Sequence, residues 1–372
     1  METEYVHSPD LRVRRLRAGN APLVWTGSGH DRYGVEVDAP SPAELITWLL
    51  KASRPATESG LLASLRADLG IETDAAKQVL KELIEAGALI EKDSSDLARV
   101  RAERWQEFGW FDPAAFHSAT FGQRFDPDTL DGMDYPTYYR QLLENSQDVG
   151  EQPPAVKPVD LYGEPVEVEP TDRVPVAAET VLNGLMPINH FERSMLDAAD
   201  VVGLLGDAAG AQRTVGGTLG EHLIKAHPSG GARHPLECYV VAKHLNGMPG
   251  GVYHFQPTDH RLRPVPGAGA PEEIDTICFG KGGIATAAAV VVVTCRWLRH
   301  SWKYRYPRSY RMIMLELGHL VQTFNLTAAA RGLGAYHCPS VDDAAMLEFL
   351  GLDDDGIEGP LYAIGIGAEG IR

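Results

Sequence analysis

The chain has 372 residues, of which 44% are hydrophobic and 23% charged, a composition typical of globular proteins and not of disordered or fibrous ones. Its 51 acidic and 34 basic side chains give a formal net charge of -17, which argues against nucleic acid or an anionic membrane as the main partner. The first residues lack the apolar core of a signal peptide, the longest apolar stretch is too short to span a bilayer, and the four cysteines contain no CxxC pair. We therefore expect a cytoplasmic protein of about two domains.

Residues 1–95 are predicted to form a separate N-terminal domain. A β-rich start is followed by three amphipathic helical stretches, over residues 42–50, 61–69 and 74–86. The third stretch ends at Gly87, a glycine suited to a helix C-cap, and residues 88–92 have the pattern of a strand. Three helices followed by a β-wing are typical of a winged helix.

The expected partner of this winged helix is not DNA. Its third helix offers two lysines, Lys77 and Lys81, against three acidic residues, which is a poor surface for a phosphate backbone. Two other interpretations stay open. The domain could hold a leader peptide, as small domains do in enzymes that modify ribosomally made peptides, or it could be a scaffolding or dimerisation module.

Residues 96–180 have a different composition. An aromatic cluster at residues 105–117 is followed by a proline-rich run at residues 151–175, and prolines at this density break both helices and interior strands. We therefore predict an extended connector. The aromatic cluster has two interpretations, the wall of a pocket or a helix packed across a domain junction.

Residues 181–372 mix strands and helices without the strict alternation that marks a parallel sheet. Strands are predicted over residues 236–242, 251–255, 287–294 and 361–366. Helices are predicted over residues 196–205, 309–331 and 342–350. The first two strands flank a turn-rich segment and are expected to form a hairpin, so the predicted fold class is α+β with a largely antiparallel sheet.

The loop at residues 228–235 reads PSGGARHP and enters the first of these strands. Its two glycines let the backbone come close to a planar or anionic ligand, and Ser229 and Arg233 supply hydrogen-bond donors. By itself the pattern also fits any tight turn before a strand. A later turn, at residues 331–335, offers a similar choice between a helix C-cap and a close approach to a cofactor.

Residues 296–311 form a basic and aromatic segment in an acidic protein. They contain six lysine or arginine residues, five tryptophan or tyrosine residues and no acid. One explanation is an anionic ligand, because arginine pairs with phosphate while aromatic rings stack on a ring system. The other is that these cations pair with the acidic C-terminal residues 341–372. The two explanations are compatible, and both stay open.

Three segments together resemble a known family. They read PSGGARHPLECYVV at residues 228–241, GGVYHFQPTDHRLRPV at residues 250–265 and WKYRYPRSYRMIMLELGHLVQTFNLTAAARGLGA at residues 302–335. In order and spacing they are similar to the SagB-type dehydrogenase branch of the FMN-dependent nitroreductase superfamily, whose best known members oxidise azoline rings in peptide natural products. The resemblance covers roughly residues 181–372. It implies a nitroreductase-like core, with a central antiparallel sheet flanked by helices, and FMN bound at the subunit interface of a homodimer.

The resemblance also implies a function. It points to oxidation of an azoline to an azole, or an equivalent two-electron oxidation, in a ribosomally synthesised precursor peptide, with a cyclodehydratase as a further partner. Two alternatives are kept. One is a flavin enzyme that reduces dehydroamino acids or small electrophiles with NAD(P)H. The other is a non-catalytic, peptide-binding subunit of a modifying complex.

The resemblance assigns roles to individual residues. The positions that it places against the flavin are Ser229, Gly230, Gly231, Arg233, Gly332 and Gly334. Lys303 and Tyr304 match the catalytic pair of this branch. A lysine with its ordinary pKa of about 10.4 is protonated and cannot act as a base, but neighbouring cations and burial lower that pKa. We therefore expect Lys303 to be the general base, and Tyr304 to be its proton partner, a positioning residue or an aromatic packed beside the flavin.

The opening of the C-terminal domain departs from the family pattern. The superfamily usually begins with an Arg-Arg-Ser/Thr-x-Arg segment that helps to bind the flavin phosphate, whereas residues 186–194 read MPINHFERS. Only Arg193 and Ser194 offer comparable chemistry. The remaining candidates for the phosphate are Arg213, Arg308 and Arg311.

No metal is expected from the sequence. Glu316 and His319 have the i, i+3 spacing of di-metal carboxylate sites, but such a site needs a second copy, which the sequence lacks. Three histidines, His222, His227 and His234, lie around the loop at residues 228–235. Histidines near a turn are more often solvated or packed than ligating, and these three are interpreted in that way.

Overall fold

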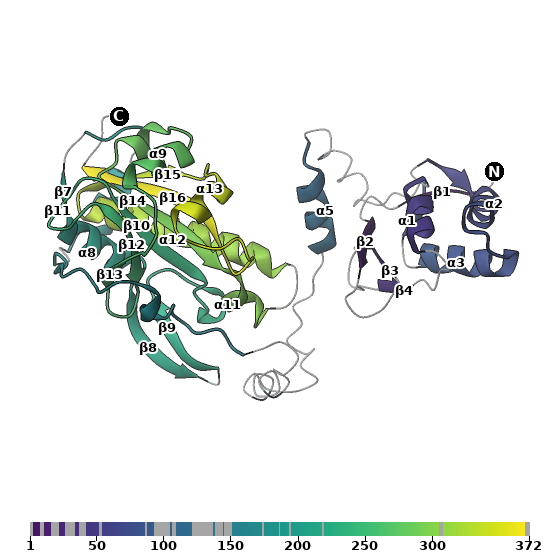
Figure 1. Cartoon of the computed structure of the whole chain (residues 1–372), viewed down its shortest axis with the longest axis horizontal. Coiled ribbons are helices and arrows are strands. Elements are labelled where there is room, and N and C mark those ends of the chain that lie inside the picture. Colours follow the sequence, from purple (N-terminus) through teal and green to yellow (C-terminus); the bar gives the residue numbers. More distant parts are fainter. Residues whose placement is uncertain are drawn as a thin grey trace. The chain divides into compact units, whose positions relative to one another are not determined.

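The computed structural model describes residues 3–7, 11–15, 22–26, 34–36, 42–51, 54–85, 88–92, 105, 109–120, 137, 144, 151–172, 175–185, 187–192, 195–217, 219–304 and 308–368. The chain divides into two compact units, Met1–Pro127 and Asp128–Arg372 (Figure 1). The domain limits expected at residues 95 and 180 stay predictions. In the part of the chain that the structure describes, every helix is too short or too polar to cross a membrane.

The first unit contains helices and strands where the sequence predicts them. Its helices are α1 (Pro42–Lys51), α2 (Glu58–Leu69), α3 (Thr73–Glu85) and α5 (Phe111–Thr120). One small sheet has the order β5 (Ala56–Thr57), β1 (Glu4–His7), β6 (Leu89–Glu91), and another has β2 (Leu11–Arg15), β3 (Pro22–Thr26), β4 (Gly34–Glu36). Buried leucines of the first three helices, such as Leu45, Leu65 and Leu80, form its core. The winged-helix interpretation itself stays a prediction.

A six-stranded sheet is the centre of the second unit. Its order is β13 (Arg261–Pro264), β12 (Gly251–Gln256), β10 (Leu236–Ala242), β14 (Ala289–Arg296), β16 (Glu358–Ala368), β15 (Leu333–Cys338). All five pairings are antiparallel, which confirms the sheet type predicted from the sequence. The hairpin of β10 and β12 is confirmed as well, with Ala242 opposite Gly251.

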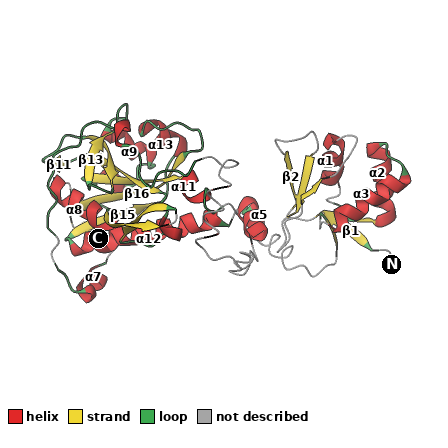
Figure 2. Ribbon diagram, turned by 90° about the horizontal axis from the view of Figure 1, so that it is seen from below, coloured by secondary structure: helices red, strands yellow, loops and turns green. Residues whose placement is uncertain are grey.

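Both faces of this sheet are buried. Along β14 successive valines are fully buried and alternate between two hydrophobic clusters, because successive side chains of a strand point to opposite faces. Val291 and Val293 pack with helices α8 (Ala198–Ala208) and α12 (Ser309–Ala330). Val290 and Val292 pack with α9 (Ile274–Ile277) and α13 (Asp343–Phe349). Figure 2 shows the yellow strands of this sheet between the red helices.

The remaining elements of the second unit are short. The helices are η3 (Val159–Leu161), α7 (Ala178–Gly184), η4 (Gly230–Ala232), η5 (Pro271–Glu273), α10 (Gly282–Ala285) and α11 (Trp297–Ser301). The strands are β7 (Leu196–Asp197), β8 (Ala211–Gly217), β9 (Gly220–Lys225) and β11 (Leu245–Asn246). Residues 151–172 are largely extended and hydrogen-bond to β13 through Gly163 and Val166, so the predicted connector packs along the edge of the sheet.

Two differences from the predicted elements have a clear physical reason. The helix expected from residue 196 starts at Ala198, because Leu196 and Asp197 pair with β11 as a parallel bridge. The hairpin of β8 and β9 was missed. The side chains of β8 are almost all exposed, so the strand lacks the alternation of buried and exposed residues by which a strand is recognised in a sequence.

Candidate functional site

The loop that carries Ser229, Gly230 and Gly231 lies between β9 and β10 and is fixed to helix α12. The hydroxyl of Ser229 donates to Oε2 of Glu316 at 2.6 Å and accepts from the backbone N–H of His234 at 2.9 Å. Gly231 has φ of 60°, and Ala232 and His234 also have positive φ, at 52° and 43°. Non-glycine residues rarely adopt this conformation, and such strain concentrates at functional sites.

The predicted catalytic pair lies directly against this loop. A Cβ atom placed on Gly231 would stand 2.7 Å from Nζ of Lys303 and would also overlap the hydroxyl of Tyr304. The pair follows α11, where the backbone N–H groups of Lys303 and Tyr304 both donate to the carbonyl of His300. The structure therefore brings together two segments, predicted separately, that are about seventy residues apart in the chain.

Charge and burial at this place lower the pKa of Lys303 towards neutral pH. Burial, together with the neighbouring guanidinium of Arg233, lowers the pKa of Lys303 to about 8. Burial also lowers the pKa of His300 to about 4, with Arg233 and Lys303 adding to the effect. The proposed base is thus closer to its deprotonated form at neutral pH than an ordinary lysine.

Several polar atoms around the loop are buried without a hydrogen-bond partner among the described residues. They are Nη2 of Arg233 and both ring nitrogens of His300. The Nε of Arg233 donates to the carbonyl of Arg299 at 3.0 Å. Buried polar groups are normally paired, so these atoms are suited to a ligand with hydrogen-bonding groups. Sequence reasoning missed His300, although it lies one helical turn before the Lys303–Tyr304 pair in the basic segment.

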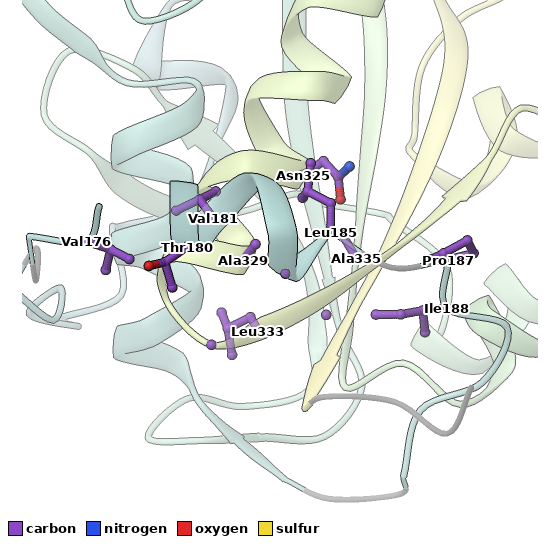
Figure 3. A pocket seen from close by; sticks show the side chains of 13 residues that line it. Val176, Thr180, Val181, Leu185, Pro187, Ile188, Asn325, Ala329, Leu333 and Ala335 are labelled. Carbon is purple, nitrogen blue, oxygen red and sulfur yellow. The ribbon is translucent and has the colours of Figure 1, made fainter. Parts of the chain in front are cut away.

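The second glycine turn is at the other end of helix α12. Gly332 has φ of 69°, and Gly334 is the second residue of β15. Both line a pocket of about 220 Å³ between α7, the end of α12 and β15, into which Asn325 and Leu333 project (Figure 3). Between Glu316, which holds the Ser229 loop, and Ala330 the helix rises about 21 Å. The two glycine segments that the resemblance places against one flavin are therefore far apart within a single chain.

The residues predicted to bind the phosphate lie on different elements of the structure. Arg213 is exposed on β8, and Arg308 and Arg311 are half-buried at the start of α12, in the region of the Lys303–Tyr304 pair. Burial lowers the pKa of Arg311, and the charge of Arg308 contributes. Arg193 and Ser194 lie outside the described residues.

One arginine of the basic segment forms an ion pair with a residue outside the acidic C-terminal part of the chain. Arg299 contacts Oε1 of Glu237 at 2.6 Å, and both side chains are buried. In the acidic C-terminal part, Glu358 pairs with Lys157 at 2.8 Å. Neither of these two ion pairs joins residues 296–311 to residues 341–372, which is the pairing that the sequence suggested.

Comparisons with known proteins cover the part of the chain that contains this site. Residues 190–368 match the model of the nitroreductase family. The trifolitoxin-processing protein TfxB of Rhizobium leguminosarum bv. trifolii is 37% identical over 139 residues, which is 36% of this chain and 37% of that protein. The chain therefore matches little more than a third of the length of TfxB.

Two further similarities span more of the chain. The trifolitoxin operon protein TfxC of the same organism is 22% identical over 343 residues, which cover 87% of this chain and 91% of that protein. Among solved structures, a chain of the E. coli microcin synthetase McbBCD complex with truncated pro-MccB17 bound is 17% identical, with a TM-score of 0.42, over 89% of this chain and 98% of that chain.

Proposed function

Residues 190–368 form a nitroreductase-family domain, and from this premise we propose that the protein is an FMN-dependent dehydrogenase that oxidises an azoline in a ribosomally made peptide. The observation that carries the proposal is the contact of Lys303 and Tyr304 with the Gly230–Gly231 loop, in the arrangement that the SagB-type branch implies. The naming of TfxB as a trifolitoxin-processing protein supports a peptide as the substrate.

The residues of this site fit a flavin. At Gly230 and Gly231 a Cβ atom would overlap Met312, Lys303 and Tyr304, so the lack of a side chain lets the proposed catalytic pair lie directly against the main chain of the loop. The unpartnered Nη2 of Arg233 and the ring nitrogens of His300 are hydrogen-bonding groups of the kind that the ring edge of a flavin requires. Arg308 and Arg311 lie at the start of α12, shortly after the pair in the sequence, and are proposed to hold the phosphate.

Conversion of an azoline to an azole removes a proton and a hydride from adjacent atoms of the ring. When bound, FMN supplies the acceptor for the hydride. Lys303 takes the proton at Nζ from the acidic ring carbon, which its lowered pKa allows near neutral pH. Tyr304, whose ring centroid is 5.2 Å from that nitrogen, is proposed to relay the proton or to position the substrate ring.

The separation of the two glycine segments supports a homodimer. In one chain the Ser229 loop and the Gly332 turn lie near opposite ends of α12, about 21 Å apart along its axis, which is further than a single flavin ring system spans. A second copy could bring its own Gly332 turn to the Ser229 loop of the first. A two-fold arrangement would do this twice and give two equal sites.

Mixing two inactive variants should restore activity in such a dimer. Lys303→Ala disables one half of the site, and Gly332→Trp fills the open space in front of the other half, where a Cβ has no neighbour within 4 Å. After subunit exchange, half of the dimers are mixed and each contains one intact site, so we expect about a quarter of wild-type oxidation. If exchange is verified and the mixture stays as inactive as each variant alone, the site lies within one subunit.

The N-terminal unit is proposed to recognise the peptide. Its sheet β5-β1-β6 has two short edge strands, and an extended peptide can bind by adding a strand to such an edge. A cyclodehydratase is the proposed partner, because an azoline must be formed before it is oxidised. The proposed setting is the cytoplasm.

The two alternatives predict different masses for the peptide product. A dehydrogenase removes two hydrogens per modified residue, whereas a reductase of dehydroamino acids adds two. A non-catalytic, peptide-binding subunit leaves the mass unchanged. Mass spectrometry of the precursor peptide before and after incubation with this protein therefore tests the proposed function.

A further inference from the structure

Three buried side chains from separate parts of the chain meet behind the Ser229 loop. His227 follows β9, His234 precedes β10, and Glu316 lies on α12. Their exposed fractions are 2%, 4% and 2%. Nδ1 of His234 is 3.3 Å from Nε2 of His227, and Oε1 of Glu316 is 3.7 Å from the first nitrogen and 3.9 Å from the second.

Hydrogen bonds to backbone atoms outside the cluster orient the two histidine rings. Nδ1 of His227 faces the carbonyl of Ala208 at 3.3 Å and can only donate to it, which leaves a lone pair on Nε2. His234 is hydrogen-bonded to the backbone of Leu223. Such outer hydrogen bonds are the usual means of orienting a histidine that binds a metal.

The carboxylate of Glu316 has one paired and one unpaired oxygen. Oε2 accepts from the Ser229 hydroxyl at 2.6 Å. Oε1 is buried without a hydrogen-bond partner among the described residues and points at the two imidazole nitrogens. An unpaired buried carboxylate oxygen is costly, and its natural partner at this place is positive.

The spacing of the three atoms fits a transition metal. A circle through the corners of a triangle with sides of 3.3, 3.7 and 3.9 Å has a radius of about 2.1 Å, which is the length of zinc bonds to histidine nitrogen and carboxylate oxygen. One point thus lies at bonding distance from all three. Two histidines and one glutamate are also a donor set that zinc accepts.

A buried lysine, Lys225, lies near this cluster, because its charge acts on His227, His234 and Glu316. The carboxylate of Glu316 has a buried oxygen without a hydrogen-bond partner among the described residues, and that oxygen is suited to a positive ion.

We propose that His227, His234 and Glu316 form a zinc site. The ion would join both ends of the Ser229–His234 loop to helix α12, while the Ser229 hydroxyl holds the other oxygen of the ligating carboxylate. It would thereby fix the strained loop against Lys303 and Tyr304. The proposed ligands are 7 and 82 residues apart in the chain, so no local spacing in the sequence connects them.

The test uses the full-length chain without a histidine tag. The protein is stripped with EDTA, incubated with zinc chloride, separated from free metal by gel filtration and analysed for zinc by mass spectrometry. We expect about one zinc ion per chain and a higher melting temperature with zinc than with EDTA. Glu316→Gln and His227→Asn should each weaken zinc binding by at least about tenfold and lose the zinc-dependent part of the melting temperature.

His319→Gln is the matched control, because His319 is exposed on the same helix, close to Glu316 in sequence. It should bind zinc like the wild type. Cobalt provides a readout that needs no variant: Co²⁺ bound to nitrogen and carboxylate ligands at low coordination number gives intense visible bands, which hexa-aquo Co²⁺ lacks. Wild-type protein that retains no zinc and gives no such bands overturns the proposal, as do folded Glu316→Gln and His227→Asn variants that bind zinc as tightly as the control. None of these readouts depends on flavin or on peptide oxidation.

Discussion

Replacing Lys303 with alanine is expected to lower peptide oxidation by about 10²–10⁴-fold, the usual contribution of a general base, while FMN stays bound. The reason is that Lys303 stands beside the loop that we propose to contact the flavin, where burial and Arg233 bring its pKa to about 8. The measurement is the rate of peptide oxidation, with flavin occupancy determined in parallel from visible absorption. Lys303→Arg should be equally slow, because arginine keeps the charge but does not lose its proton.

The pH profile distinguishes a base from a merely structural lysine. A base acts in its neutral form, so wild-type kcat should rise as the pH rises through about 8 and then level off. In Lys303→Ala the residual kcat should no longer rise as the pH passes through about 8. Lys281→Ala, which removes an exposed lysine before α10, is the control and should keep both the rate and the profile. A Lys303→Ala protein with full flavin and an unchanged rate would remove Lys303 from the mechanism.

A single added methyl group at Gly231 is expected to abolish most flavin binding and with it most activity. In Gly231→Ala the new Cβ would lie 2.7 Å from Nζ of Lys303 and would overlap the hydroxyl of Tyr304, so the pair or the loop has to move. The φ of 60° adds backbone strain of about 1–2 kcal/mol for a residue with a side chain. Flavin titration and thermal melting measure the two effects.

The control variant Gly267→Ala introduces backbone strain without displacing a neighbouring side chain. Gly267 has a similar φ of 74°, but its Cβ would have no neighbour within 4 Å. This variant should show the cost of backbone strain alone and should bind FMN like the wild type. Equal flavin affinity in Gly231→Ala and Gly267→Ala would mean that the Gly231 loop does not touch the flavin.

The hydrophobic pattern predicts four of the six strands of the central sheet, β10, β12, β14 and β16, and the helices α8, α12 and α13. The uninterrupted apolar run of β14 and the turn between β10 and β12 determine the centre of the sheet, and the sequence predicts both. Strands that lack such a pattern were missed. The exposed β8 is one, and β13, which has only four residues, is another.

The site is harder to predict because its residues are far apart in the sequence and come together only in the folded chain. Lys303 and Gly231 were paired only through the family resemblance, since neither spacing nor periodicity connects two segments so far apart. The sequence does not single out His300, and it suggests for Glu316 only a pairing with His319, because burial and unpaired atoms are not visible in a sequence. The separation of Gly332 from the Ser229 loop could be measured only once α12 was in place.

The most direct test of the proposed dehydrogenase is a single turnover without oxygen. FMN-loaded protein is mixed anaerobically with the azoline-containing precursor peptide, and flavin absorption and peptide mass are followed in the same sample. The account predicts that the oxidised flavin spectrum is bleached and that the peptide loses two hydrogens for each flavin reduced. A peptide of unchanged mass beside a fully oxidised flavin, under conditions in which the two are shown to bind, would contradict it.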